Sequence, residues 1–155
     1  MGLPGGVARA VLLFNGVMML GAGIGYLKGV QDNTFEGLDG IFTAAASAAC
    51  SHDGDHQCWL ALIPFFSMTY MAFGALAILA GMSFGSYEAS AVLFLLALTH
   101  VAQAYARMYV IPQALLQADK AWSMSLGQLT FCGLDLAGCG LLLFELLQQE
   151  KPKAE

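Results

Sequence analysis

Hydrophobic residues are gathered into four long runs along the chain, separated by segments that hold many of its charged residues. The runs cover approximately residues 7–28, 59–82, 87–109 and 124–148. An α-helix needs about 20 mostly apolar residues to cross a hydrocarbon core of about 30 Å. Each run reaches that length, and the runs are too continuous for the alternating strands of a transmembrane barrel. The pattern predicts an all-α integral membrane protein, an antiparallel bundle of four transmembrane helices that forms one domain over residues 1–155.

The composition supports this class of protein. Of the 155 residues, 58% are hydrophobic and 11% are charged, whereas soluble domains carry about 25% charged residues. The formal net charge is -5, and the six Lys and Arg residues are scattered along the chain. Nucleic-acid binding needs clustered basic residues that neutralise phosphates. We therefore expect the lipid bilayer as the main surrounding and no nucleic-acid partner.

The first hydrophobic run resembles a signal peptide in one respect, because Arg9 precedes it. The run is longer than a signal-peptide core and no small-residue cleavage site follows promptly, so we interpret it as a retained span. Four spans place both termini on one side. Three basic residues flank the spans on each side, but those on the terminus side lie in or beside the tails. This favours termini in the cytoplasm, matrix or stroma, and the pattern does not identify the organelle.

The connections between the runs carry two further predictions. The segment "PQALLQADKAW" begins with Pro112, which suits the first turn of a helix, and ends with the amphipathic Trp122. It predicts a short interfacial helix between the third and fourth spans. In the long first loop, a disulfide between Cys50 and Cys58 is compatible with an oxidising compartment, and two free thiols are the alternative.

The same loop contains the segment "SHDGDHQ". Histidines four residues apart can share a face and bind zinc or copper, which makes His52 and His56 candidate metal ligands. Gly54 interrupts any helix between them, and no second ligand cluster has a matching spacing. A solvated polar loop without a metal is therefore the favoured interpretation.

Small residues recur at helical spacing in three of the runs. Membrane helices associate through close packing at such residues, because lipid tails are as apolar as leucine. We expect helix packing at one stripe on the first span and at small-residue faces on the second and fourth, namely at Gly21, Gly25 and Gly29, at Gly74 and Gly81, and at Gly133 and Gly140.

A few polar residues lie inside the runs, and they share helix faces. His100, Gln103 and Arg107 form one stripe on the third span, because steps of three and four residues return to the same face. Gln128 and Asp135 lie on a similar stripe of the fourth span. If the two helices are antiparallel neighbours, His100 is level with Asp135 and Arg107 is level with Gln128. We therefore predict contact between His100 and Asp135, with Gln103, Gln128 and Arg107 extending an intramembrane polar network.

Other spans also carry polar residues that can contribute. Asn15 in the first span, and Thr69 and Tyr70 in the second, are candidates for hydrogen bonds across the bundle. Glu88 and Glu145 lie near the terminus-side ends of their spans, where water is within reach. We expect these two carboxylates to be solvated.

The chemistry of the His100 and Asp135 pair is open at this stage. An imidazole beside a carboxylate can exchange protons or bind a ligand, but a hydrogen-bonded pair that fixes helix register is the favoured interpretation. No cofactor is predicted. Two-histidine haem ligation would need a partner subunit, because His100 is the only histidine within a run.

No nucleophile elbow, phosphate loop or zinc-protease motif occurs in the chain, so an enzyme is not favoured. We expect an accessory or structural subunit of a multi-subunit membrane complex, for example a bioenergetic complex, packing through glycine-rich helix faces against other membrane subunits. The alternatives are a small membrane enzyme or binding protein for a lipid-soluble ligand, or a proton pathway. Both alternatives use His100, Asp135 and Arg107.

Overall fold

The computed structural model describes residues 3–31, 63–110 and 118–149, and apart from Phe84 and Gly85 every described residue is helical. The helices are α1 (Leu3–Gln31), α3 (Ile63–Ser83), α4 (Ser86–Tyr105) and α5 (Ala118–Gln149). A single π-helical turn, η3 (Ala106–Val110), continues α4. All four helices are long and apolar enough to cross a membrane. The predicted all-helical class is confirmed, and the predicted runs match these helices to within a few residues.

The start of α5 differs from the prediction of a separate interfacial helix. Residues 118–122 are the first residues of the 32-residue helix α5, which continues without a break to Gln149. Trp122 therefore belongs to the fourth long helix. The rest of the predicted interfacial helix, residues 112–117, lies outside the described residues.

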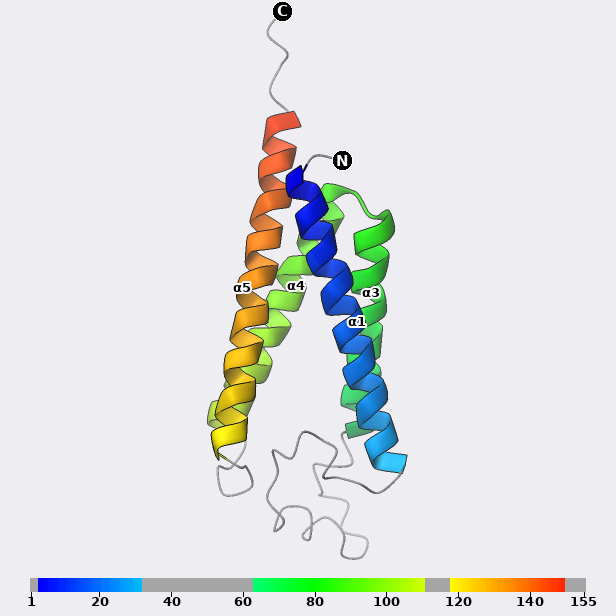
Figure 1. Cartoon of the computed structure of the whole chain (residues 1–155), viewed down its shortest axis with the longest axis vertical. Helices are drawn as coiled ribbons and strands as arrows, with labels where there is room; N and C mark the ends of the chain where they lie inside the picture. The colour runs from blue at the N-terminus through cyan, green and yellow to red at the C-terminus, as the bar shows by residue number, and fades with distance from the viewer. Residues whose placement is uncertain (1–2, 32–62, 111–117, 150–155) are drawn as a thin grey trace, which may run out of the picture.

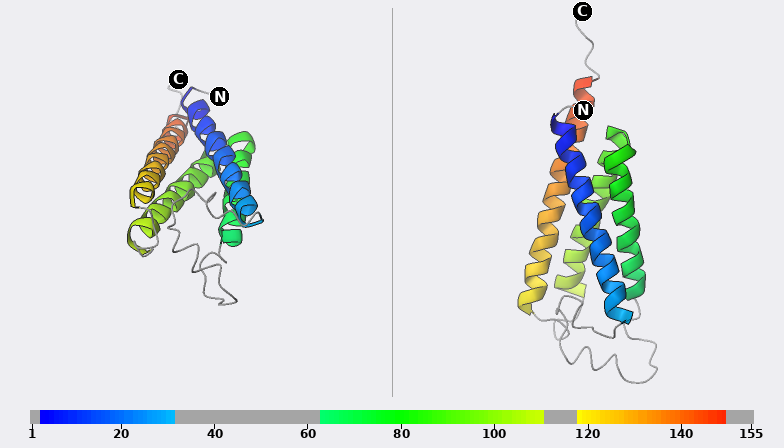
Figure 2. Two further views of the ribbon diagram at one scale, coloured as in Figure 1. Left: turned by 60° about the horizontal axis from the view of Figure 1, so that its bottom comes forward. Right: turned by 45° about the vertical axis from the view of Figure 1, so that its right-hand side comes forward.

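The four helices associate as two pairs. Most contacts between elements join α1 to α3 and α4 to α5, while α1 touches α5 less extensively and α3 touches α4 least. Figures 1 and 2 show the two pairs close together where α1 begins and α5 ends, and further apart toward the opposite end. The oblique course of α4, which starts beside the end of α3 and finishes beside the beginning of α5, joins the pairs (Figure 1).

Close backbone approach holds α1 against α3. A Cβ atom added at Gly16 would lie 2.8 Å from the Gly74 carbonyl oxygen, and one added at Gly74 would lie 2.8 Å from the Gly16 carbonyl oxygen. Gly23 similarly faces the Ser67 carbonyl oxygen at 2.8 Å. Only glycine allows two helix backbones to approach this closely, which maximises van der Waals contact. Because Gly23 pairs with Ser67 and Gly16 with Gly74, the two helices run in opposite directions.

The packing glycines differ in part from those predicted. Gly74 and Gly81 do face α1, as expected for the second span. On α1, however, the contact is made at Gly16 and Gly23, and a Cβ at Gly21 or Gly25 would meet nothing within 4 Å in the described part of the chain. Gly133 and Gly140 on α5 also face open space. The predicted stripe on α1 is therefore on the wrong face for packing within the chain, because two glycine spacings coexist in this helix and its rotation toward α3 selects one. Gly29, the third glycine of that stripe, lies within α1.

The terminus-side half of the structure has a continuous apolar core. Its fully buried leucines come from three helices and are Leu12, Leu93, Leu96 and Leu142. Small side chains, among them Ala8, Ala77 and Ala89, fill the spaces between them. This cluster anchors α1, α4 and α5 together at the end of the molecule where the two helix pairs converge.

Arg9 closes the end of α3 rather than lying free in the tail. Its Nη1 atom donates to the carbonyl oxygens of Ala80 and Gly81 at 3.3 and 3.2 Å, and its Nη2 atom donates to that of Phe84 at 2.8 Å. The last carbonyls of a helix have no partner within the helix, and the helix dipole favours a cation there. Arg9 thus satisfies the orphan acceptors at the tight turn between α3 and α4.

We expect Gly74→Ala to weaken the contact between α1 and α3. The added methyl group would meet backbone atoms of α1, which cannot move aside without shifting the helix, so the loss of stability should be about 1–3 kcal/mol. The matched control is Gly21→Ala, whose methyl group meets open space and which should change stability by less than about 1 kcal/mol. Unfolding of the purified protein by SDS titration measures both. Equal effects of the two substitutions would contradict the packing described here.

Removing the cap at the end of α3 should also be measurable. Arg9→Met keeps the apolar stem but leaves three carbonyl oxygens without their donor, so we expect a loss of about 1–3 kcal/mol in the same titration. Lys28→Met is the control, because Lys28 is exposed in the last turn of α1. The interpretation fails if the two variants are equally stable.

A buried polar cluster as the candidate functional site

Asp135 is the centre of a buried polar cluster that joins three helices. The residue lies on α5 and has no exposed surface. Its Oδ1 atom accepts a hydrogen bond from Asn15 Nδ2 on α1, and its Oδ2 atom lies 2.9 Å from His100 Nδ1 on α4. Asn15 and His100 are themselves only 2% and 4% exposed. We call these three residues the Asp135 cluster.

Helix periodicity and chain direction bring the cluster together. His100 follows the buried Leu93 and Leu96 at steps of three and four, so it lies on the face of α4 that packs into the protein. Asp135 follows Cys132 and precedes Leu142 on the buried face of α5. Because α5 returns alongside α4, His100, which lies 14 residues after the start of α4, meets Asp135, which lies 14 residues before the end of α5. The structure thus places His100 and Asp135 in the contact that the sequence predicts.

Asn15 completes the cluster from the opposite helix pair. It is the one amide residue in the predicted first span, and the sequence gives it no specific partner. Its position on α1 is one residue before Gly16, so the same rotation that turns Gly16 toward α3 directs Asn15 toward α5. The glycine contact and the hydrogen bond to Asp135 therefore depend on each other.

The burial of Asp135 in an apolar protein demands such partners. An ionised side chain at the centre of a bilayer costs at least about 2.5–3.5 kcal/mol on insertion scales. Two hydrogen-bond partners from two different helices stabilise the carboxyl group in this position and fix the depth of α5 relative to α1 and α4. The cluster therefore both stabilises the buried carboxyl group and fixes the register of the three helices.

Aromatic rings connect the cluster to the outside of the helices. The His100 imidazole lies against the Phe131 ring, with centroids 5.5 Å apart and planes tilted by 33°. Phe131 in turn stacks with Phe14 at 6.0 Å and 24°. Phe14 is 53% exposed, Phe131 is half-buried and His100 is buried. A series of ring contacts therefore leads from the surface of α1 to the imidazole.

Gln103 contributes to a second polar contact, separate from the Asp135 cluster. Its Oε1 atom accepts a hydrogen bond from the Tyr70 hydroxyl group on α3. Tyr26 packs edge-on against the Tyr70 ring, with centroids 5.7 Å apart. This contact joins α1, α3 and α4 on the side of the cluster away from the termini. Gln103 is inward-facing as predicted, but its described hydrogen-bond partner is Tyr70.

Arg107 and Gln128 lie further toward the same end. Arg107 is half-buried in the π-helical turn η3, a type of distortion that is frequent at functional sites. Gln128 is half-buried on α5, and its shielded Oε1 atom accepts no hydrogen bond from the described residues. Within the described chain, Asp135 hydrogen-bonds to Asn15 and His100. The predicted extension of the network through Gln103, Arg107 and Gln128 therefore does not reach the carboxyl group directly.

Other predicted chemistry can be placed only in part. Among the described residues, no group of three or more His, Cys, Asp and Glu side chains is arranged to hold a metal ion. Cys132 and Cys139 on α5 are free thiols. The predicted disulfide residues Cys50 and Cys58, and the candidate metal ligands His52 and His56, lie outside the described residues.

The two glutamates near the terminus-side ends of α4 and α5 differ in their surroundings. Glu88 is exposed in the first turn of α4. Glu145 is half-buried, and its carboxylate lies so close to Gly5 that an added Cβ there would be 2.3 Å from Oε2. Gly5 is in the first turn of α1, where the helix dipole favours a negative charge. Glu145 therefore links α5 to α1 instead of being simply solvated.

Comparison with known proteins adds no assignment, because no family model, curated protein or solved structure matches the chain. The functional argument consequently depends on the residues themselves.

A double-mutant cycle tests the contact at the centre of the cluster. We expect His100→Ala and Asp135→Ala to be coupled by on the order of 1 kcal/mol, because each substitution removes the partner of the other. The control cycle pairs Asp135→Ala with Thr99→Ala, since the Thr99 hydroxyl group bonds to Leu95 of its own helix. That cycle should be additive within about 0.5 kcal/mol. SDS titration of the three single variants, the two double variants and the parent measures both couplings, and an additive first cycle would refute the contact.

Proposed function

We propose that this chain is a multi-pass integral membrane protein, an antiparallel bundle of four transmembrane helices, that serves as an accessory or structural subunit of a larger membrane complex. The observation that carries the proposal is the distribution of polar and small residues. Buried polar side chains are hydrogen-bonded to one another between the helices, whereas six of the described glycines, among them Gly21, Gly25, Gly133 and Gly140, face outward into open space.

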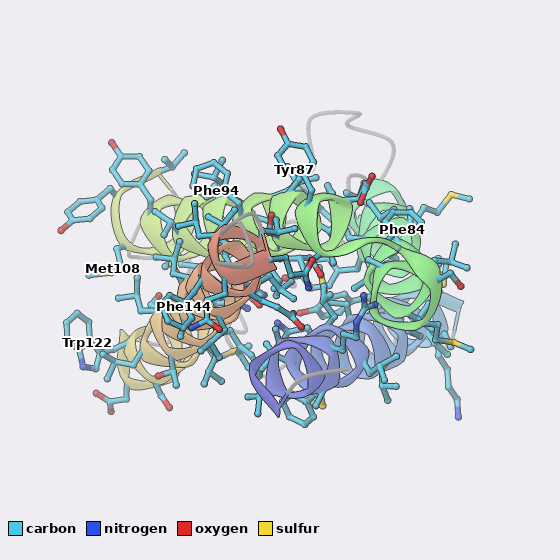
Figure 3. All side chains as sticks on the ribbon, turned by 90° about the horizontal axis from the view of Figure 1, so that it is seen from above. Phe84, Tyr87, Phe94, Met108, Trp122 and Phe144 are labelled. Atoms are coloured by element: carbon cyan, nitrogen blue, oxygen red, sulfur yellow. The ribbon has the colours of Figure 1, made fainter. Side chains whose placement is uncertain are left out.

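The aromatic residues of α4 and α5 support insertion into a bilayer. Tyr87 is exposed at one end of α4, while Tyr105 and Tyr109 are exposed at the other end, near the exposed Trp122 of α5. Tyr87 and Trp122 point away from the helices in Figure 3. At 1.5 Å per residue, Tyr87 and Tyr109 are separated by about 33 Å. This matches the aromatic belts that lie at both surfaces of a hydrocarbon layer about 30 Å thick.

Membrane insertion also accounts for the many exposed apolar side chains between these belts. Large hydrophobic residues such as Val17, Ile24 and Phe94 are at least half exposed. In water, such a surface would favour aggregation, whereas in a bilayer these apolar side chains contact lipid tails that are equally apolar. The inward-facing Asp135 cluster then lies near the middle of the layer, where polar groups need partners most.

The outward-facing glycines favour a partner subunit. A Cβ at Gly21, Gly25, Gly133 or Gly140 would meet nothing within 4 Å in the described chain. Gly21 and Gly25 are four residues apart on one face of α1, the spacing that allows two membrane helices to approach closely. A glycine in a helix is less favourable than alanine by about 1 kcal/mol. Close packing against another membrane protein would offset that cost.

A proton pathway through the molecule is not part of the proposal. Such a pathway would have to connect Asp135 with Glu145 across the terminus-side half of the structure. The fully buried side chains there include Leu93, Leu96 and Leu142, which offer no hydrogen bonds. The polar residues Tyr70, Gln103 and Gln128 all lie on the other side of Asp135. Within the described chain, the fully buried side chains on the terminus side are apolar, and the hydroxyl group of the buried Ser90 there bonds to Tyr87 of its own helix.

Replacement of outward-facing glycines tests the subunit proposal. In carbonate-washed membranes solubilised with a mild detergent, we expect the chain to migrate in native gels as a stoichiometric complex. Gly21→Leu should release it from that complex, because the larger side chain blocks close helix approach, while the isolated chain keeps its stability. Val17→Leu is the control on another exposed position of α1. Extraction by carbonate, migration as a single stable chain, or an unchanged complex for Gly21→Leu would count against the proposal.

A further inference from the structure

One nitrogen of the buried imidazole is left without a protein partner. His100 is 4% exposed, and its hydrogen bond to the described residues is made through Nδ1. Nε2 forms none with any residue in the ranges 3–31, 63–110 and 118–149. Nε2 is not one of the fully shielded side-chain atoms of the described chain, so a molecule from outside the chain can reach it, and a polar nitrogen in an apolar interior is stabilised by such a partner.

Charge neutrality decides what Nε2 offers to such a partner. A net charge buried in an apolar interior is strongly disfavoured, so the His100 and Asp135 pair holds one proton between them in addition to the proton of a neutral imidazole ring. If this proton lies on Nδ1, the pair is imidazolium and carboxylate. If it lies on Oδ2, the carboxylic acid donates to Nδ1 and the ring proton is on Nε2. In both arrangements Nε2 carries a hydrogen and is a donor, so a molecule that binds to it must supply an acceptor.

The surroundings indicate a flat, apolar molecule. Phe131 lies against the imidazole and Phe14 lies against Phe131, and Phe14 is exposed on the surface of α1. Aromatic rings favour stacked or edge-on contacts with other rings. This ring series connects the outer surface of α1 with His100.

We propose that His100 and Phe131 form a binding site for a planar, lipid-soluble carbonyl compound of the quinone class, which enters from the lipid between α1 and α5. The Nε2 hydrogen of His100 donates to the carbonyl oxygen, and the ring of the ligand packs against Phe131. Asp135 is a positioning residue that holds the imidazole in the required orientation, and Asn15 holds Asp135. The site rests on the proposed insertion into a bilayer but not on the accessory-subunit role, because all its residues belong to this chain.

A pair of probes that differ only at the carbonyl groups tests the site. Tetramethyl-1,4-benzoquinone and hexamethylbenzene have similar shape, but only the quinone accepts hydrogen bonds. In equilibrium dialysis of the full chain in detergent micelles, corrected for empty micelles, we expect the quinone to bind about tenfold more tightly, the contribution of one buried hydrogen bond. The histidine Nε2 resonance of His100 in nitrogen NMR should shift with the quinone and not with hexamethylbenzene.

A matched pair of phenylalanine variants locates the bound molecule. Phe131→Leu should weaken quinone binding about three- to tenfold through the loss of ring contact. Phe84→Leu should leave it unchanged, because Phe84 is equally half-buried but lies at the turn between α3 and α4. Both variants keep an apolar side chain of similar volume, and SDS titration establishes that each is folded. Equal affinity for the two probes, an unchanged His100 resonance, or equal effects of the two variants would overturn the proposal.

Discussion

The structure depends on one constraint, the need of the Asp135 carboxyl group for partners in an interior that offers no water. A carboxyl group on an apolar helix can face neither lipid nor leucine without a large free-energy cost. Its hydrogen bonds to Asn15 and His100 set the rotation of α5 and its depth relative to α1 and α4. The two helix pairs, which share the apolar core on the terminus side, are thereby also joined at mid-length. The glycine contact between α1 and α3 acts in the same direction, because Gly16 and the adjacent Asn15 are oriented by one helix rotation.

The sequence predicts the elements well and their rotations poorly, and the glycines of α1 show why. Length and hydropathy predict the helices, because continuous runs of about 20 apolar residues are typical of helices that can span a membrane. The contact between His100 and Asp135 follows from depth alone, because antiparallel neighbours match residues at equal height. The choice between the Gly21 and Gly25 face and the Gly16 and Gly23 face is different. Both spacings occur in one helix, and only the contacts with α3 and α5 select the face that packs.

Arg9 illustrates a second limit of sequence reasoning. A lone arginine near the end of a hydrophobic run is typical of a charge anchored at a membrane surface. In the structure it caps the carbonyl groups at the end of α3, more than seventy positions away in the chain. The feature of the sequence that could have predicted this contact is the two-residue turn after Ser83. So short a turn leaves the last carbonyl groups of α3 without partners, and α1 lies close enough to provide a donor.

The unequal halves of the interior bear on what a buried histidine and carboxyl group can do. On the terminus side the described core is mostly leucine, alanine and valine, which holds the helices together, and the buried Ser90 there bonds within its own helix. On the other side the described polar groups gather in the part of the molecule where the two helix pairs diverge (Figure 1). A polar cluster that is bordered by apolar side chains on one side is better suited to binding one molecule than to transferring protons from one end of the structure to the other. The free Nε2 of His100, beside a ring series that reaches the surface, is consistent with this role. A molecule bound there would meet a donor whose direction is fixed by three helices at once.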